Sequence, residues 1–201
     1  MNQIEVLLSQ HFPKERPNSY HYYKQKSGKT YPVGRGASLR RRSLYTFWRR
    51  TSPPPTLSAF GAPTREVCTV ARPSTVTPHQ SLALWNDPQF VEVAVRLGRA
   101  AVEREARIEA RIDYLCLALL SREPDAVQRG VLSELWETQA EAFAADPAAA
   151  RSLAHFDLER ELRPDEAPAP PELSDLRAAE LATAAIVAST LLGLDEALTR
   201  R

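Results

Sequence analysis

Arg65, Glu66 and Cys68 form a compact trio of chemically reactive side chains in the sequence. A glutamate beside a thiol and an arginine could carry out acid–base or nucleophilic chemistry. Such trios more often form a salt bridge and a buried thiol where a loop crosses the fold, and we favour that interpretation. The trio is therefore a candidate binding or interface site, and no residue of the chain is assigned a catalytic role.

A second candidate site is the segment RRRSLYTFWRRTSPPP at residues 40–55. Leu44, Phe47 and Trp48 have the i, i+3, i+4 spacing of one helix face, and the prolines that follow predict an extended, polyproline-like exit. We favour a helix that packs this face on the core while its arginines pair with acidic helices. The candidate binding or interface residues here are Arg41, Arg42, Tyr45, Trp48, Arg49 and Arg50.

Nucleic-acid binding is the competing interpretation of that segment. It would use the same arginines for phosphate contacts and the aromatic rings for base stacking. No nucleic-acid motif surrounds the segment, and the rest of the chain is acidic, so no nucleic-acid partner is expected.

Asn86 and Asp87 are the last candidate pair, because they could line a pocket or bind a cation. The plainer role is capping a helix that starts at Pro88. His79 is expected to be exposed at a helix start, and no metal or cofactor is predicted, because ligand spacing is missing around His11, His21 and His155.

The composition of the chain limits the class of protein and the number of domains that could position these residues. The chain has 201 residues, 43% of them hydrophobic, and a net charge of +1, which fits one soluble domain with or without an appended segment. Residues 1–55 carry about +9 and the remainder about −8. Attraction within the fold is favoured over an acidic partner.

Cysteine usage and hydropathy add further limits. Cys68 and Cys116 form no metal or haem pattern; two buried thiols are favoured, although pairing in an oxidising compartment stays open. The sequence shows no signal peptide and no run long enough to span a bilayer, so membrane insertion is not predicted and the compartment is not indicated.

Helix starts are marked where a capping side chain precedes a proline, at Thr77-Pro78, Asp87-Pro88 and Asp146-Pro147. Apolar spacings of three and four predict helices over about 78–85, 88–104 and 106–121. A fourth helix carries Val127, Val131, Leu135, Trp136 and Phe143. A fifth, over about 175–192, is capped by Ser174, includes Leu176 and stops at Gly193.

These helices predict an all-α fold, a small bundle of about five helices covered by the Pro-, Arg- and aromatic-rich N-terminal segment. Leu82 and Trp85 are expected to face inward, and Glu92 with Arg96 to form a surface pair. Residues 1–39 are predicted to be a poorly structured basic head. Residues 40–201 form the helical domain, with a Pro-rich linker at 163–173.

The stretch RRSLYTFWRRTSPPPTLSAFGAPTREVCTVARPSTVTPHQSLALWNDPQFVEVA, at residues 41–94, resembles the signature region of a domain of unknown function in planctomycetes and related bacteria. In that family the domain closes large exported proteins, after another uncharacterised domain and often a c-type cytochrome-like module. The resemblance runs from about residue 40 to the C-terminus. It implies an exported or periplasmic setting and a companion domain or cytochrome-like protein as partner.

Departures from the family pattern limit what can be carried over. Gly61 stands where the pattern has Asp, and Gly193 and Ala197 replace Asn and Phe near the end. Ser74, Val76 and His79 replace Arg, Asn and Leu. If the family's Asp and Asn were catalytic or metal-binding, this copy has lost them. The companion and cytochrome-like parts are absent, which suggests a fragment, a split gene or a degenerate paralogue.

Two functions follow from the residues and the resemblance together. The favoured one is a non-catalytic terminal module that stabilises or docks onto companion domains of an exported, cytochrome-linked assembly. The alternative is a redox or polysaccharide-related enzyme whose active site is shared with a missing companion domain. The residues that this chain would contribute to the shared active site are Arg41, Arg42, Arg65 and Glu66.

Overall fold

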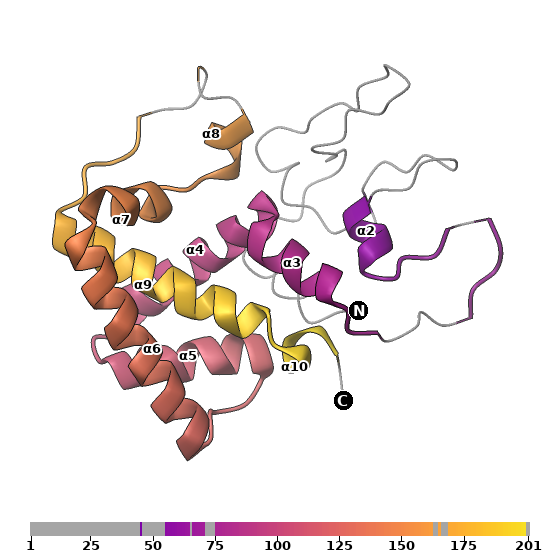
Figure 1. Cartoon of the computed structure of the whole chain (residues 1–201), viewed down its shortest axis with the longest axis horizontal. Helices are drawn as coiled ribbons and strands as arrows, with labels where there is room; N and C mark the ends of the chain where they lie inside the picture. The colour runs from indigo at the N-terminus through magenta and orange to yellow at the C-terminus, as the bar shows by residue number, and fades with distance from the viewer. Residues whose placement is uncertain are drawn as a thin grey trace. The chain divides into compact units, whose positions relative to one another are not determined.

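The structure is a computed structural model that describes residues 45, 55–64, 66–70, 75–162, 165 and 169–199 (Figure 1). Within these ranges all regular elements are helices, which confirms the all-α prediction. The helices are α2 (Pro55–Ala59), α3 (Pro78–Asn86), α4 (Pro88–Arg104), α5 (Ile108–Leu120), α6 (Ala126–Ala145), α7 (Pro147–Ala154), α8 (Leu158–Leu162), α9 (Asp175–Leu192) and α10 (Asp195–Leu198). Residues 81–198 form one compact unit, and residues 1–80 with 199–201 form a second.

The start of α2 corrects the predicted extended exit. Pro55 and Thr56 are helical, because a proline in the first turn loses no hydrogen bond that the helix needs. The helix ends at Ala59, and the chain then turns at Gly61, whose φ of 68° lies in the left-handed region. Its N–H donates to Ser58 O at 3.0 Å, and Ala62 N–H donates to Leu57 O at 2.8 Å. Position 61, where the family pattern has Asp, is therefore a helix-ending turn.

The predicted helix starts are confirmed by their hydrogen bonds. Thr77 Oγ1 accepts from Gln80 N–H at 3.4 Å, and Asp87 Oδ1 accepts from Gln89 N–H at 3.0 Å. Asp146 and Ser174 cap α7 and α9 in the same way. Each side-chain oxygen satisfies a backbone donor that has no partner within its helix.

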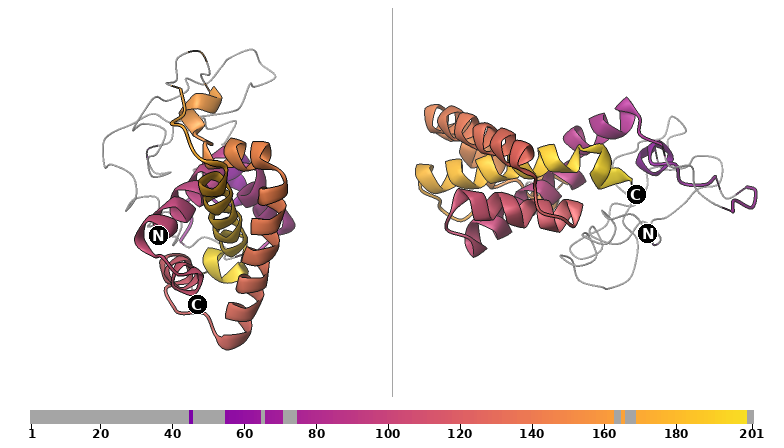
Figure 2. Two further views of the ribbon diagram at one scale, coloured as in Figure 1. Left: turned by 90° about the vertical axis from the view of Figure 1, so that its left-hand side faces the viewer. Right: turned by 90° about the horizontal axis from the view of Figure 1, so that it is seen from below.

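The core of the unit formed by residues 81–198 is arranged around α9. This helix packs most extensively against α4, α7 and α6 and also contacts α5, and Figure 2 shows it running between them. Small side chains make its close approach possible, since five alanines of α9 are at most 1% exposed: Ala178, Ala182, Ala184, Ala185 and Ala188. The helices thus bury a shared core that none could form alone.

Several predicted orientations are wrong. Leu82 and Trp85 of α3 were expected inside but are 63% and 61% exposed, and Leu84 takes the buried position at 0%. Val127, Val131 and Leu176 also belong to the predicted apolar stripes and are exposed. Conversely, Glu92 is 2% exposed, so its ion pair with Arg96 at 2.9 Å is not the surface pair that was predicted.

The short helix α10 is fixed by a bidentate ion pair that the sequence pattern did not indicate. Arg122, in the turn between α5 and α6, donates from Nε and Nη2 to the two carboxylate oxygens of Glu196, each at 2.7 Å. Such fork-to-fork pairing is more specific in geometry than a single charged contact. It ties the C-terminal end of the bundle to the α5–α6 turn. Across the described ranges, no helix has the length and hydrophobicity needed to cross a membrane.

Candidate functional site

The arginine-rich candidate site lies largely beyond the described part of the chain. Tyr45 is described and is 43% exposed. The other predicted residues of this group that fall outside the described residues are Arg41, Arg42, Trp48, Arg49, Arg50 and Arg65. An enzyme site built from Arg41, Arg42, Arg65 and Glu66 consequently stays a prediction.

The two described members of the trio, Glu66 and Cys68, lie on an exposed segment without regular structure. Both cysteines are free thiols; the burial predicted for Cys68 is wrong, and that predicted for Cys116 is confirmed. Burial, helped by the nearby Asp113 carboxylate, raises the pKa of Cys116 to about 11. The Cys116 thiol is thus protonated near neutral pH.

Asn86 and Asp87 serve the local backbone. The Asp87 carboxylate caps α4, as favoured from the sequence. The Asn86 side-chain amide donates to Leu82 O at 2.9 Å, one turn earlier in α3. Capping of α4 is therefore the role of Asp87 alone, whereas the Asn86 side chain bonds back to the last turn of its own helix.

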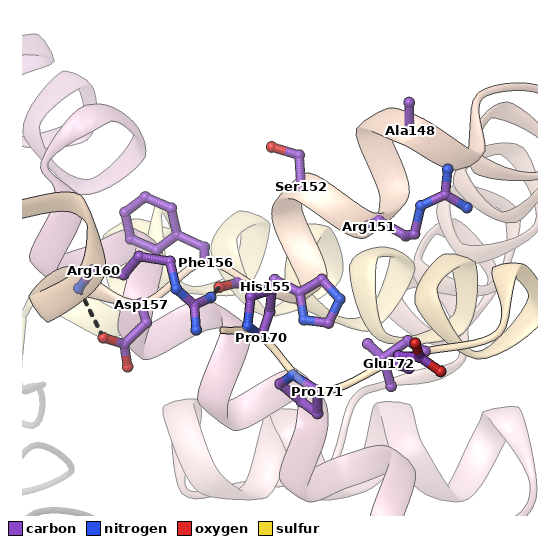
Figure 3. Close-up of a pocket in the computed structure, with 11 residues that line it drawn as sticks. Ala148, Arg151, Ser152, His155, Phe156, Asp157, Arg160, Pro170, Pro171 and Glu172 are labelled. Atoms are coloured by element: carbon purple, nitrogen blue, oxygen red, sulfur yellow. Dashed lines mark hydrogen bonds between the residues drawn. The ribbon is translucent and has the colours of Figure 1, made fainter. Parts of the chain in front are cut away.

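A pocket that the sequence did not indicate lies between α7, α8 and the segment at 170–173 (Figure 3). Its volume is about 720 Å³. We call it the His155 pocket, and its charged and polar lining consists of Arg151, Ser152, His155, Asp157, Arg160 and Glu172. No regular spacing links these residues in the sequence, because three separate elements supply them.

Arginines from three helices surround His155. Arg99 Nη2 of α4 donates to Ala154 O at 3.1 Å, and Arg160 Nη1 of α8 donates to His155 O at 3.0 Å. Arg151 of α7 pairs with Asp175 at the start of α9. Burial, followed by the charges of Arg160, Arg99 and Arg151, lowers the pKa of His155 below its ordinary value of 6.5. The imidazole is therefore neutral near pH 7.

Acidification is expected to destabilise the protein through His155. The unfolded chain binds a proton at this imidazole more readily than the folded chain does, so the contribution is intact above about pH 6.5 and declines below it. Equilibrium urea unfolding between about pH 7.5 and 5 should show a smaller acid-induced loss for His155→Gln than for wild type. The other charged groups around His155 are Arg99, Arg151, Arg160 and the pocket residue Glu172. Identical pH profiles for the two proteins would contradict the prediction.

An exposed apolar surface lies on the same unit, and we call its residues Leu82, Trp85 and Leu194 the Trp85 surface. Leu82 lies one turn before Trp85 on α3 and Leu194 is 38% exposed. The Trp85 indole rests on Gly193, because a Cβ added there would lie 2.6 Å from indole Nε1. With φ at −73°, Gly193 ends α9 without a left-handed turn. A side chain here would displace the indole.

Comparison with known proteins places the chain in a family. A family model described as PSD1, protein of unknown function (DUF1553), matches residues 6–136, a range that includes residues 41–94. No curated protein and no solved structure matches the chain. Since the family match spans more than half of the sequence and includes α3, α4 and α5, the chain belongs to the PSD1 family of domains of unknown function.

Proposed function

We propose that this domain is a non-catalytic interaction module that docks, through the Trp85 surface, onto a companion domain or cytochrome-like protein of an exported bacterial assembly. The observation that carries the proposal is the exposure of Trp85 and Leu82, at 61% and 63%. Tryptophan in protein interfaces commonly supplies a large share of the binding energy. The exported and cytochrome-linked setting is supported by the family resemblance alone.

The Trp85 side chain is also held in place for binding. Its contact with Gly193 restricts the indole in the absence of a partner, so less rotamer entropy is lost when a partner covers it. Leu82 extends the same apolar face by one turn of α3. A partner with an apolar pocket could therefore gain affinity from Trp85 with little rearrangement.

The charge of this unit favours a basic partner. Residues 81–198 contain 22 carboxylate side chains and 11 arginines, and no lysine. The resulting formal charge of −11 would attract a positively charged protein and raise the rate of association at low salt. The proposed partner therefore combines an apolar pocket with a basic surround.

Replacing Trp85 with alanine is expected to weaken partner binding by about 30-fold or more, because a central tryptophan typically contributes over 2 kcal/mol. The free energy of unfolding should change by under about 1 kcal/mol, since most of the ring is in solvent. The companion protein would be identified by co-purification with products of neighbouring genes, then purified for calorimetric titration.

Leu176→Ala is the matched control for this experiment. Leu176 is 84% exposed on the first turn of α9, outside the Trp85 surface, so its loss should leave the affinity unchanged. Equal weakening by Leu176→Ala, or unchanged affinity of Trp85→Ala, would reject the Trp85 surface as the docking site.

A further inference from the structure

The His155 pocket is separate from the Trp85 surface and has the features of a ligand site. Figure 3 shows the His155 side chain between those of Arg151 and Arg160. A guanidinium has five N–H donors, so an arginine that already donates to a carbonyl or carboxylate can also hold an anion. The pocket thus brings together two cationic side chains and a neutral imidazole.

The two carboxylates that line the pocket, Asp157 and Glu172, differ in how strongly they would repel a bound anion. Asp157 is directed to the start of α8, where its Oδ1 accepts from Glu159 N–H at 3.0 Å and Arg160 N–H at 3.2 Å. Its other oxygen lies 3.5 Å from Arg96 Nη2. Glu172 is exposed and lines the pocket from the 170–173 segment. It is the carboxylate that would reduce affinity for an anion.

One polar atom of the pocket lacks a hydrogen-bond partner. Nδ1 of His155 is buried and has no hydrogen bond among the described residues, although nearly all buried polar atoms in folded proteins have one. Because this nitrogen has almost no solvent-accessible surface, a ligand reaches it, and recovers the free energy that the missing hydrogen bond costs, only when the imidazole turns toward the pocket. In the tautomer that carries the proton on Nδ1, this nitrogen would donate to an anionic oxygen.

We propose that the His155 pocket binds a small organic anion, a carboxylate or phosphate monoester with an apolar body. The charged group lies between Arg151 and Arg160 and accepts a hydrogen bond from His155. The apolar body contacts the apolar side chains that line the same pocket, which are Phe156, Pro170 and Pro171. This binding site is independent of the docking function proposed for the Trp85 surface.

The test uses the full chain and follows its histidine ring signals by NMR during titration with phenyl phosphate, benzoate and inorganic phosphate at constant ionic strength. We expect a saturable shift of the His155 signals and a rise in the pKa of His155, because a bound anion favours the imidazolium form. His79, exposed at the start of α3, is the internal control and should not shift. The variant His155→Gln assigns the signal.

Three variants make the test specific. Arg160→Gln should weaken phenyl phosphate binding about tenfold, as expected for loss of a charge-assisted hydrogen bond, whereas Glu172→Gln should strengthen it. Arg104→Gln, on the exposed end of α4, should have no effect. Thermal unfolding of each variant verifies that it is folded.

Other results would overturn the proposal. Unsaturable shifts, equal shifts of His79 and His155, or no effect of Arg160→Gln would indicate an adventitious ion only. If phenyl phosphate and benzoate bound no better than inorganic phosphate, the assigned contact with Phe156 and the two prolines would be wrong. A partner protein that bound with unchanged affinity to Arg160→Gln would leave the docking function standing, so the two proposals can fail separately.

Discussion

Replacing Gly98 with alanine is expected to lower the free energy of unfolding by about 3 kcal/mol, which is large for the addition of one methyl group. A Cβ at this position of α4 would lie 2.6 Å from Ala185 N and 2.7 Å from Ala184 C, both in the backbone of α9. Backbone atoms cannot rotate aside as a long side chain can. The two helices would have to separate, and their contact is the most extensive in the bundle.

Gly130→Ala is the control that isolates this close approach from the intrinsic effect of the substitution. Gly130 lies inside α6, and a Cβ added to it would have no atom within 4 Å. Alanine should therefore stabilise the protein by about 0.5–1 kcal/mol, because glycine loses more backbone entropy in a helix. Urea unfolding monitored by circular dichroism gives both values. Effects of the same sign would show that the contact between α4 and α9 is not the cause.

The helix starts could be predicted because the signals for them are local. A capping oxygen and the donors it satisfies lie within three residues of each other, so Thr77, Asp87, Asp146 and Ser174 act without help from the rest of the fold. The same locality explains why the missed elements, α2, α8 and α10, are four or five residues long. Their apolar positions are too few to show a period.

The inward face of α3 could not be predicted from spacing. Leu82 and Trp85 lie on one face of this nine-residue helix and Leu84 lies on another, so the apolar pattern does not identify which face is buried. Burial of Leu84 and exposure of Trp85 depend on where the other helices lie. The four-residue spacing of Glu92 and Arg96 predicts a surface pair, whereas the structure buries the Glu92 carboxylate beside Arg96.

The two candidate sites, the His155 pocket and the Trp85 surface, could not be predicted from local sequence patterns either. His155 has no metal-ligand spacing in the sequence, because its neighbours in the pocket are arginines and prolines from α7, α8 and the 170–173 segment. Trp85 was recognised as an apolar helical residue, but its contact with Gly193 joins positions more than one hundred residues apart. Neither arrangement leaves a signal in a short stretch of sequence.

Replacing Trp136 with alanine is expected to lower the free energy of unfolding by about 4 kcal/mol, within the range measured for buried large aromatic residues. Of the 20 residues of α6, the buried ones are Leu132 and Trp136, so the ring supplies much of the apolar contact that holds this helix to the bundle. Trp136 is 4% exposed. Its removal leaves a cavity that one leucine cannot fill.

The loss of stability in Trp136→Ala should exceed the part that comes from lost packing alone, because Arg111 lies over the Trp136 ring, 5.7 Å from its centre. Arg111 is 7% exposed, pairs with Glu180 at 2.8 Å and donates to Glu105 O at 2.7 Å. Trp136→Phe retains an aromatic face for this cation and should cost about half as much as Trp136→Ala. Urea unfolding of both variants tests the comparison. Equal losses would mean that Arg111 gains nothing from the ring, and a loss below about 1 kcal/mol for alanine would mean that α6 is held by other contacts.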